Sequence, residues 1–203
     1  MFSTKGQEVK TGGGIPKSLQ PGVVYAHIHS SEVRVSKNTG KKALEFILEG
    51  PSLDNFEGWS ITRGDDNGPK FKGQSSRVMA TMWTDQHSDT NISKNEILYK
   101  LSVIAQELGL VQEVGAINAT TIEDWVAQAT RLVAGHNLYF FIKGNEEEYE
   151  GKTRVKLSLP KFKFASADES KLDTFDKNNQ YHYKALANKA VNSFEPATDD
   201  FEM

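Results

Sequence analysis

The chain has 203 residues, of which 37% are hydrophobic and 25% charged, and this favours one folded domain with extensions. It contains no cysteine, which excludes a disulfide framework, a thiolate zinc site and a thiol nucleophile. No apolar run approaches the roughly 18 residues of a membrane span, and the polar first residues do not resemble a secretory signal. We therefore expect a folded, soluble protein of the cytoplasm.

The net charge of −3 hides an uneven distribution of charge. Residues 195–203 carry Glu195, Asp199, Asp200 and Glu202 with no basic residue between them. In contrast, five cations fall within twelve residues that contain no acid, namely Lys152, Arg154, Lys156, Lys161 and Lys163. A basic strip and an acidic tail are thus the two charged features of the chain.

The first part of the chain predicts a flexible lead followed by three strands. Residues 1–21 are polar, contain several Gly and Pro, and show no periodicity. Residues 23–36, 41–50 and 71–84 alternate between apolar and polar positions, which predicts strands, the first two joined as a hairpin. Their expected inward residues are Val24, Ala26 and Ile28, then Leu44, Phe46 and Leu48, then Val78, Ala80 and Met82.

The hydrophobic period then changes to that of a helix. A stripe in residues 93–109 predicts one helix, with Ser93 and Glu96 as a capping box and Gly109 at its end. A second helix is predicted to begin with the capping box of Thr120 and Glu123 and to end at Gly135.

Strand patterns return at residues 137–143 and 152–159, and the alternation continues through residues 161–164 beyond Pro160. Proline cannot donate to a ladder, so Pro160 should mark an edge or a break. After residue 165 the chain is polar, but one helical stripe predicts an appended C-terminal helix before a disordered tail; it comprises Tyr183, Leu186, Ala187, Ala190, Val191 and Phe194.

The order of elements predicts a mainly β fold with a helical insertion. Five strands with two helices between the third and fourth are what a five-stranded Greek-key barrel of the OB type requires, with antiparallel neighbours. We expect a flexible segment at residues 1–21, an OB-fold domain at 22–166 with its insertion at about 92–135, and a C-terminal extension at 167–203 with the acidic tail at 195–203.

The faces of the last two strands predict a surface for single-stranded DNA. If these strands pair, aromatic rings and cations share one face, and such a face neutralises phosphates and stacks bases for about 1–3 kcal/mol each. Trp83 with Arg77, and Tyr25 with His27, could extend it. The candidate stacking residues are Tyr25, Trp83, Tyr139 and Phe141, and the candidate phosphate contacts are Arg77, Lys143, Lys152, Arg154, Lys156, Lys161 and Lys163.

These residues also have ordinary structural interpretations. Aromatic residues in strands usually belong to the core, and alternating lysines usually protect an exposed edge. The acidic tail is expected to compete with DNA for the basic surface, and its displacement would free Phe201 and its acidic neighbours for partner proteins. A solubilising terminus is the alternative.

Signals for metal binding and catalysis are weak. His27 and His29 have a spacing that can ligate zinc, and Asp85, His87 and Asp89 form a second possible cluster, and we leave both open. Residues 12–18 (GGGIPKS) fail the pattern of a phosphate-binding loop, and no hydrolase elbow or zinc-protease helix is present. We expect no enzymatic activity and no cofactor.

Several segments occur in a recognisable order: LQPG at 19–22, LEGP at 48–51, FEGW at 56–59, GQ at 73–74, RV at 77–78, residues 120–126 and residues 152–160. Together, from Leu19 to about Phe164, they resemble OB-fold single-stranded DNA-binding proteins of tailed bacteriophages. The resemblance implies sequence-independent coating of single strands in phage DNA replication and recombination, in the cytoplasm of a bacterial host. It also implies an acidic C-terminus that regulates binding and recruits phage replication proteins.

The tail departs from the common pattern because Phe201 is followed by Glu202 and Met203 and is not terminal. Recruitment through this ring is therefore less directly implied than autoinhibition by the tail's charges. Two other functions remain open from the sequence: a phage structural or assembly β-barrel protein, and a strand-annealing recombinase.

Overall fold

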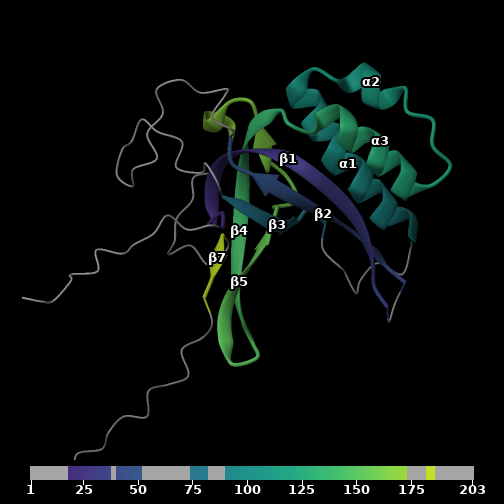
Figure 1. The fold of residues 1–203 in the computed structure, drawn as a ribbon. Helices are drawn as coiled ribbons and strands as arrows, with labels where there is room; N and C mark the ends of the chain where they lie inside the picture. The colour runs from purple at the N-terminus through teal and green to yellow at the C-terminus, as the bar shows by residue number, and fades with distance from the viewer. Residues whose placement is uncertain (1–17, 38–39, 52–73, 82–89, 173–181, 186–203) are drawn as a thin grey trace, which may run out of the picture.

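The computed structural model describes residues 18–37, 40–51, 74–81, 90–172 and 182–185. Figure 1 shows the fold, which combines a curved sheet with a group of helices on one side. In chain order the elements are β1 (Gly22–Val35), β2 (Lys42–Glu49), β3 (Ser75–Met79), α1 (Thr90–Leu108), α2 (Val111–Gly115), α3 (Ile122–Val133), β4 (Asn137–Tyr149), β5 (Lys152–Ser158), β6 (Ala165–Ser166), the 3-10 helix η2 (Glu169–Lys171) and β7 (Tyr183–Lys184).

The strands form one mixed sheet whose pairings close into a ring. β1 pairs antiparallel with β2 and with β4, β2 pairs antiparallel with β3, and β4 pairs antiparallel with β5. β3 and β5 complete the ring where Met79 lies beside Ser158 in a parallel arrangement, so the expectation of antiparallel neighbours throughout is wrong. The short strands β6 and β7 both add to β4.

Alternation along the strands sorts their side chains as predicted. Val24, Ala26 and Ile28 of β1 are buried on one face, and Leu44, Phe46 and Leu48 of β2 are buried beside them. Val78, Ala80, Leu138, Phe140 and Ile142 belong to the same core cluster. Burying such a side chain contributes roughly 1.5–3 kcal/mol, so these positions fix the strand register.

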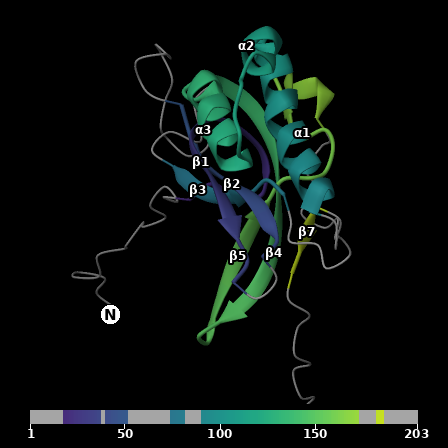
Figure 2. The same ribbon diagram turned by 90° about the vertical axis from the view of Figure 1, so that its right-hand side faces the viewer.

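The helices pack against the sheet beside β1 and β2, as Figures 1 and 2 show from two directions. Their predicted stripes are confirmed, because Ile97, Leu101 and Ile104 of α1 and Val126, Ala129 and Val133 of α3 join the sheet residues in one core. The short helix α2 between them was not predicted.

The predicted helix starts are wrong by a few residues. α1 begins at Thr90, ahead of the expected capping box at Ser93 and Glu96. The N-cap of α3 is Thr121, whose Oγ1 accepts a hydrogen bond from the backbone N–H of Asp124 at 3.1 Å, one position beyond Thr120 and Glu123. The predicted C-terminal ends of both helices are confirmed, since Gly109 and Gly135 follow the helices with φ of 73° and 76°.

Two boundaries of the domain also differ from expectation. Leu19 is buried, and its N–H donates to Ser76 Oγ at 2.9 Å, so the fold begins before residue 22. Tyr183 belongs to β7 and not to a helix, because its backbone pairs with β4 and its hydroxyl donates to Glu146. The other residues of the predicted C-terminal stripe lie outside the described residues.

The third strand and the end of the fifth are shorter than predicted. β3 covers Ser75–Met79, and the flanking positions 71–73 and 82–84 of the predicted strand lie outside the described residues. Residues 161–164 do not continue β5, because Lys163 adopts a left-handed φ of 49° that breaks the extended backbone. Pro160 therefore marks a break, as expected. In the described part of the chain, no helix is long and apolar enough to cross a membrane.

Gly144 lies where β4 changes neighbours. Up to Ile142, β4 pairs with β1, whereas Gly144 itself pairs with β7. A Cβ on Gly144 would lie 2.4 Å from Cγ of Pro21 and 3.0 Å from Cγ1 of Val155, so a side chain has no room there. The chain entering β1 can cross β4 closely only because this position is glycine.

We predict that Gly144→Ala lowers the free energy of unfolding by about 1–3 kcal/mol, because the added methyl group must displace the Pro21 ring and β5. Urea unfolding followed by circular dichroism measures this. The matched control is Gly115→Ala on α2, where a Cβ meets nothing within 4 Å and little or no loss is expected. Equal free energies of unfolding for the two variants would contradict the close approach of Pro21 to Gly144.

Candidate nucleic-acid interface

The register of β4 and β5 places the predicted cations and rings on one face. Residues directly opposite in an antiparallel pair share a face, and so do alternate residues along one strand. Lys152 lies opposite Tyr149, Arg154 opposite Glu147 and Lys156 opposite Asn145. We call this surface the β4–β5 face; it comprises Tyr139, Phe141, Lys143, Asn145, Glu147 and Tyr149 of β4 with Lys152, Arg154, Lys156 and Ser158 of β5.

The outer half of this surface stands clear of the rest of the described fold. Figures 1 and 2 both show the hairpin of β4 and β5 projecting away from the helices. Residues 152–156 are all exposed, including Lys152, Arg154 and Lys156, which were predicted as phosphate contacts. Lys143 is half-buried at the base of the hairpin, opposite Ser158.

The basic strip is not free of acids in three dimensions. Arg154 donates from Nε to Oε1 of Glu147 at 2.6 Å, and its guanidinium lies 4.2 Å from the ring centroid of Tyr149. The sequence places Glu147 several positions away, but strand pairing brings it directly opposite. Such an exposed pair typically contributes only about 0.2–1 kcal/mol and is weakened by salt, so a phosphate can compete for Arg154.

Tyr25 and Tyr139 form a pair of rings across β1 and β4. Their centroids are 4.7 Å apart with the planes at 46°, and both side chains are half-buried. Burial, followed by the charge of a deprotonated Tyr139, raises the pKa of Tyr25, so its hydroxyl remains neutral at physiological pH. The pair keeps part of its surface open at the inner end of the β4–β5 face.

Phe141 was predicted as a stacking residue, and this prediction is wrong in the structure. Its side chain is completely buried. His182, just before β7, packs edge-on against it with ring centroids 4.8 Å apart, and the backbone N–H of Phe141 donates to Phe164. Phe141 therefore lies on the expected face but is covered by a later segment of the chain.

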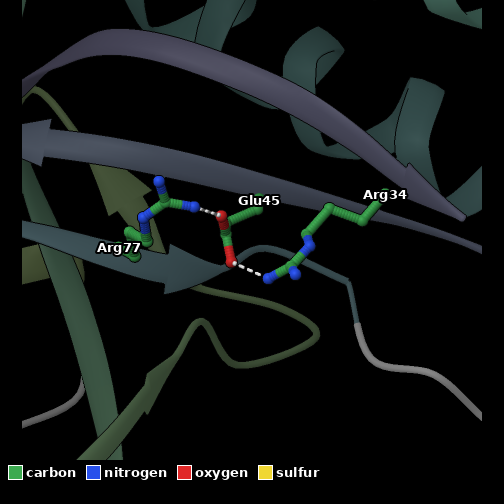
Figure 3. A network of polar contacts seen from close by, with 3 residues as sticks. All are labelled: Arg34, Glu45 and Arg77. Atoms are coloured by element: carbon green, nitrogen blue, oxygen red, sulfur yellow. Dashed lines mark hydrogen bonds and ion pairs between the residues drawn. The ribbon is translucent and has the colours of Figure 1, made fainter. Parts of the chain in front are cut away.

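Arg77 lies in a separate polar network, shown in Figure 3. Glu45 of β2 accepts from Nη1 of Arg77 at 2.9 Å through one oxygen and from Nη1 of Arg34 at 3.1 Å through the other. The Glu45 side chain is only 7% exposed, whereas those of Arg34 and Arg77 are 50% and 64% exposed. Two guanidinium groups therefore share one nearly buried carboxylate, and the exposed Glu32 lies opposite Glu45 on the same face.

We predict that Glu45→Gln lowers the free energy of unfolding by about 1–2 kcal/mol, because both guanidinium groups lose a charged acceptor and one faces an amide N–H₂. Thermal unfolding measures the change. The control is Glu32→Gln, an exposed residue opposite Glu45 on β1, which should shift stability by less than about 0.5 kcal/mol. If both substitutions have the same effect, the network contributes nothing specific.

The other candidate residues are distributed as follows. His27 and His29 both approach Glu49, at 3.6 and 3.3 Å, and no group of three metal-ligating side chains occurs among the described residues. Trp83, the second possible cluster (Asp85, His87 and Asp89) and the tail residues Glu195, Asp199, Asp200, Phe201 and Glu202 lie outside the described residues.

Sequence reasoning missed an aromatic pair beside the basic strip. Phe162, between Lys161 and Lys163, is 60% exposed, and Tyr99 of α1 is 40% exposed. Their centroids are 6.0 Å apart in an edge-to-face arrangement. The sequence offered one signal, since Tyr99 falls off the apolar stripe of α1, but nothing in it brings α1 to residue 162.

Lys100 explains how this pair is held. Its side chain is 4% exposed, donates to the backbone carbonyl of Pro160, and donates to that of Lys161 at 3.2 Å. Its Nζ also lies 3.8 Å from the ring centroid of the buried Phe164. Burial lowers the pKa of Lys100 to about 7; Glu96 opposes the shift, while Lys143 and Lys161 add to it.

This pKa predicts a stability that depends on pH. The folded-state pKa of about 7 lies below the ordinary value of 10.5, so the unfolded chain binds more protons between these values. Stability from this group therefore rises as pH increases from about 7 to about 10, by at most a few kcal/mol. Lys100→Met should flatten that rise in urea midpoints measured across this window.

The exposed Lys156→Met is the control, since it should leave the wild-type slope unchanged. A Lys100→Met slope that matches the wild type would show that the buried amine is not the source. Comparing slopes between variants removes the contribution of other groups that titrate in the same window.

In comparisons with protein-family models and with curated proteins, nothing matches this chain. The resemblance to phage single-stranded DNA-binding proteins therefore rests on the sequence segments described above. The function has to be argued from the geometry of the described surface.

Proposed function

We propose that this protein binds single-stranded DNA without sequence preference and without catalysis, as a coating protein in phage DNA replication or recombination. The observation that carries the proposal is the β4–β5 face, where the exposed cations of β5 lie on the same face of the sheet as the half-buried ring of Tyr139. The phage context comes from the sequence resemblance.

The order of the strands supports an OB-type Greek-key barrel. β4 lies beside β1, followed by β2 and β3, which is the order of a Greek key, and β5 closes the ring between β3 and β4. The helices are inserted between β3 and β4, as the sequence pattern led us to expect. Folds of this type bind oligonucleotides across their strand faces.

The chemistry of the face suits a flexible polyanion. Lys152 and Lys156 are exposed on β5 and lie four positions apart, a distance of roughly 13 Å along an extended strand. Cations in such a row displace condensed counterions from several successive phosphates. Tyr25 and Tyr139 offer aromatic surface at the inner end, where bases of a strand on this track can stack.

The acidic tail at residues 195–203 lies outside the described residues, and its role stays part of the proposal. A segment with four acids and no base competes with phosphates for the same cations. Release of this tail on DNA binding would make its acids and Phe201 available to phage replication proteins.

We predict that Lys152→Ala combined with Lys156→Ala weakens binding to a labelled oligo-dT by about 3- to 30-fold at 0.1 M salt. Loss of two phosphate contacts should also reduce the slope of log K against log salt by about 1.4. Fluorescence anisotropy across a salt series measures both. The control is Arg131→Ala, an exposed cation on α3, which should leave the slope unchanged.

Other outcomes would favour other functions. Wild-type protein that fails to bind oligo-dT and elutes as a large assembly would contradict the proposal and favour a structural role. Ring oligomers that accelerate pairing of complementary strands beyond simple coating would favour a strand-annealing recombinase. Parallel titrations with duplex DNA and with RNA measure whether the protein prefers single-stranded DNA to these ligands.

A further inference from the structure

We infer that Tyr99 and Phe162 form a stacking site for an unpaired nucleobase, and that this site makes the protein select single strands over duplexes. The inference rests on the proposed function, because it assigns a source of strand selectivity within that activity in addition to the Tyr25–Tyr139 pair. We call Tyr99 and Phe162, with Lys161 and Lys163 on either side of the latter, the aromatic corner.

The corner presents aromatic surface to solvent beside positive charge. Phe162 is the most exposed of the large hydrophobic residues described, at 60%, and Tyr99 meets it edge-to-face at 6.0 Å. Lys161 places its Nζ 5.6 Å from the centroid of the Phe162 ring, and both Lys161 and Lys163 are exposed. A ring for a base and cations for the flanking phosphates therefore occur together.

The corner is held in place from below. Lys100 is buried and donates to the carbonyls of Pro160 and Lys161, which fixes the backbone on the N-terminal side of Phe162. Phe164 is buried on the other side, 6.4 Å from Tyr99 between centroids. Lys163, between Phe162 and Phe164, has an unfavourable left-handed φ of 49°. Two buried anchors thus hold Phe162 outward.

The corner follows the end of β5 closely in the chain. Only Leu159 and Pro160 separate the end of β5 from Lys161. Lys143, at the base of the hairpin, is close enough to Lys100 to lower its pKa, as is Lys161. A nucleic-acid strand bound by the cations of β5 can therefore also meet Lys161 and the aromatic corner beyond the end of β5.

Selectivity follows from what each part can recognise. Cations bind the phosphates of duplexes and single strands alike, so the hairpin cations cannot by themselves reject a duplex. An exposed ring can stack only on a base whose face is open, and in a duplex those faces are covered by neighbouring base pairs. Unstacking a paired base has an energetic cost that an unpaired strand avoids.

The test compares dissociation constants for a labelled oligo-dT and for a duplex of equal length, using the full chain. Phe162→Ala should weaken single-strand binding by at least about fivefold, with duplex binding changed by less than about twofold. Phe162→Tyr should keep the selectivity for single strands because it keeps an aromatic ring. Phe162→Leu should lose that selectivity, although it keeps an apolar side chain. Unfolding midpoints verify that each variant is folded.

Two controls sharpen the result. Lys156→Ala should weaken the binding of oligo-dT and of the duplex by the same factor, so the ratio of the two dissociation constants should stay unchanged. Val111→Ala removes an exposed apolar side chain of α2, outside the β4–β5 face, and should leave both dissociation constants and their ratio unchanged. A ratio unaffected by Phe162→Ala, or kept at the wild-type value by Phe162→Leu, would overturn this inference alone. Wild-type protein that does not bind single strands would overturn the proposed function with it.

Discussion

The structure depends on the double use of β4. Its first half lies between β1 and β6, and its second half pairs with β5 and, at Gly144, with β7. This one strand therefore closes the ring and also carries the hairpin that projects from it. The change of neighbours is possible because Gly144 leaves room for Pro21, so the geometry of the candidate site depends on one position without a side chain.

Continuity of β4 also explains how an exposed, charged hairpin is kept in a defined orientation. Leu138, Phe140 and Ile142 are buried in the core, and their burial fixes which way every later residue of the strand faces. The same alternation turns Tyr139, Lys143 and Glu147 to the opposite face. Hydrophobic burial in one half of the strand therefore orders electrostatic groups in the other half, where exposed contacts contribute little stability of their own.

The strands and helices were predictable because their patterns are local. Alternation located β1, β2 and β4, and apolar spacing located α1 and α3, with errors of a few residues at the helix starts. The errors concerning the site have a different origin, since they involve residues distant in sequence. Phe141 is covered by His182, Arg154 meets Glu147, and Lys100 meets Pro160. The pattern of residues within one β-strand or one helix cannot reveal these contacts.

Lys100 is the residue that stability alone does not explain. A buried amine loses hydration, and a well-packed apolar side chain in its place is often as stable or more stable. What Lys100 provides is specific direction, because its donors fix two successive carbonyls while Phe164 anchors the following residue. An apolar side chain could fill the space but could not hold the backbone of Lys161 against the strained conformation of Lys163. Without Lys100, the exposed ring of Phe162 would lose one of the two anchors that hold it in water against the hydrophobic effect.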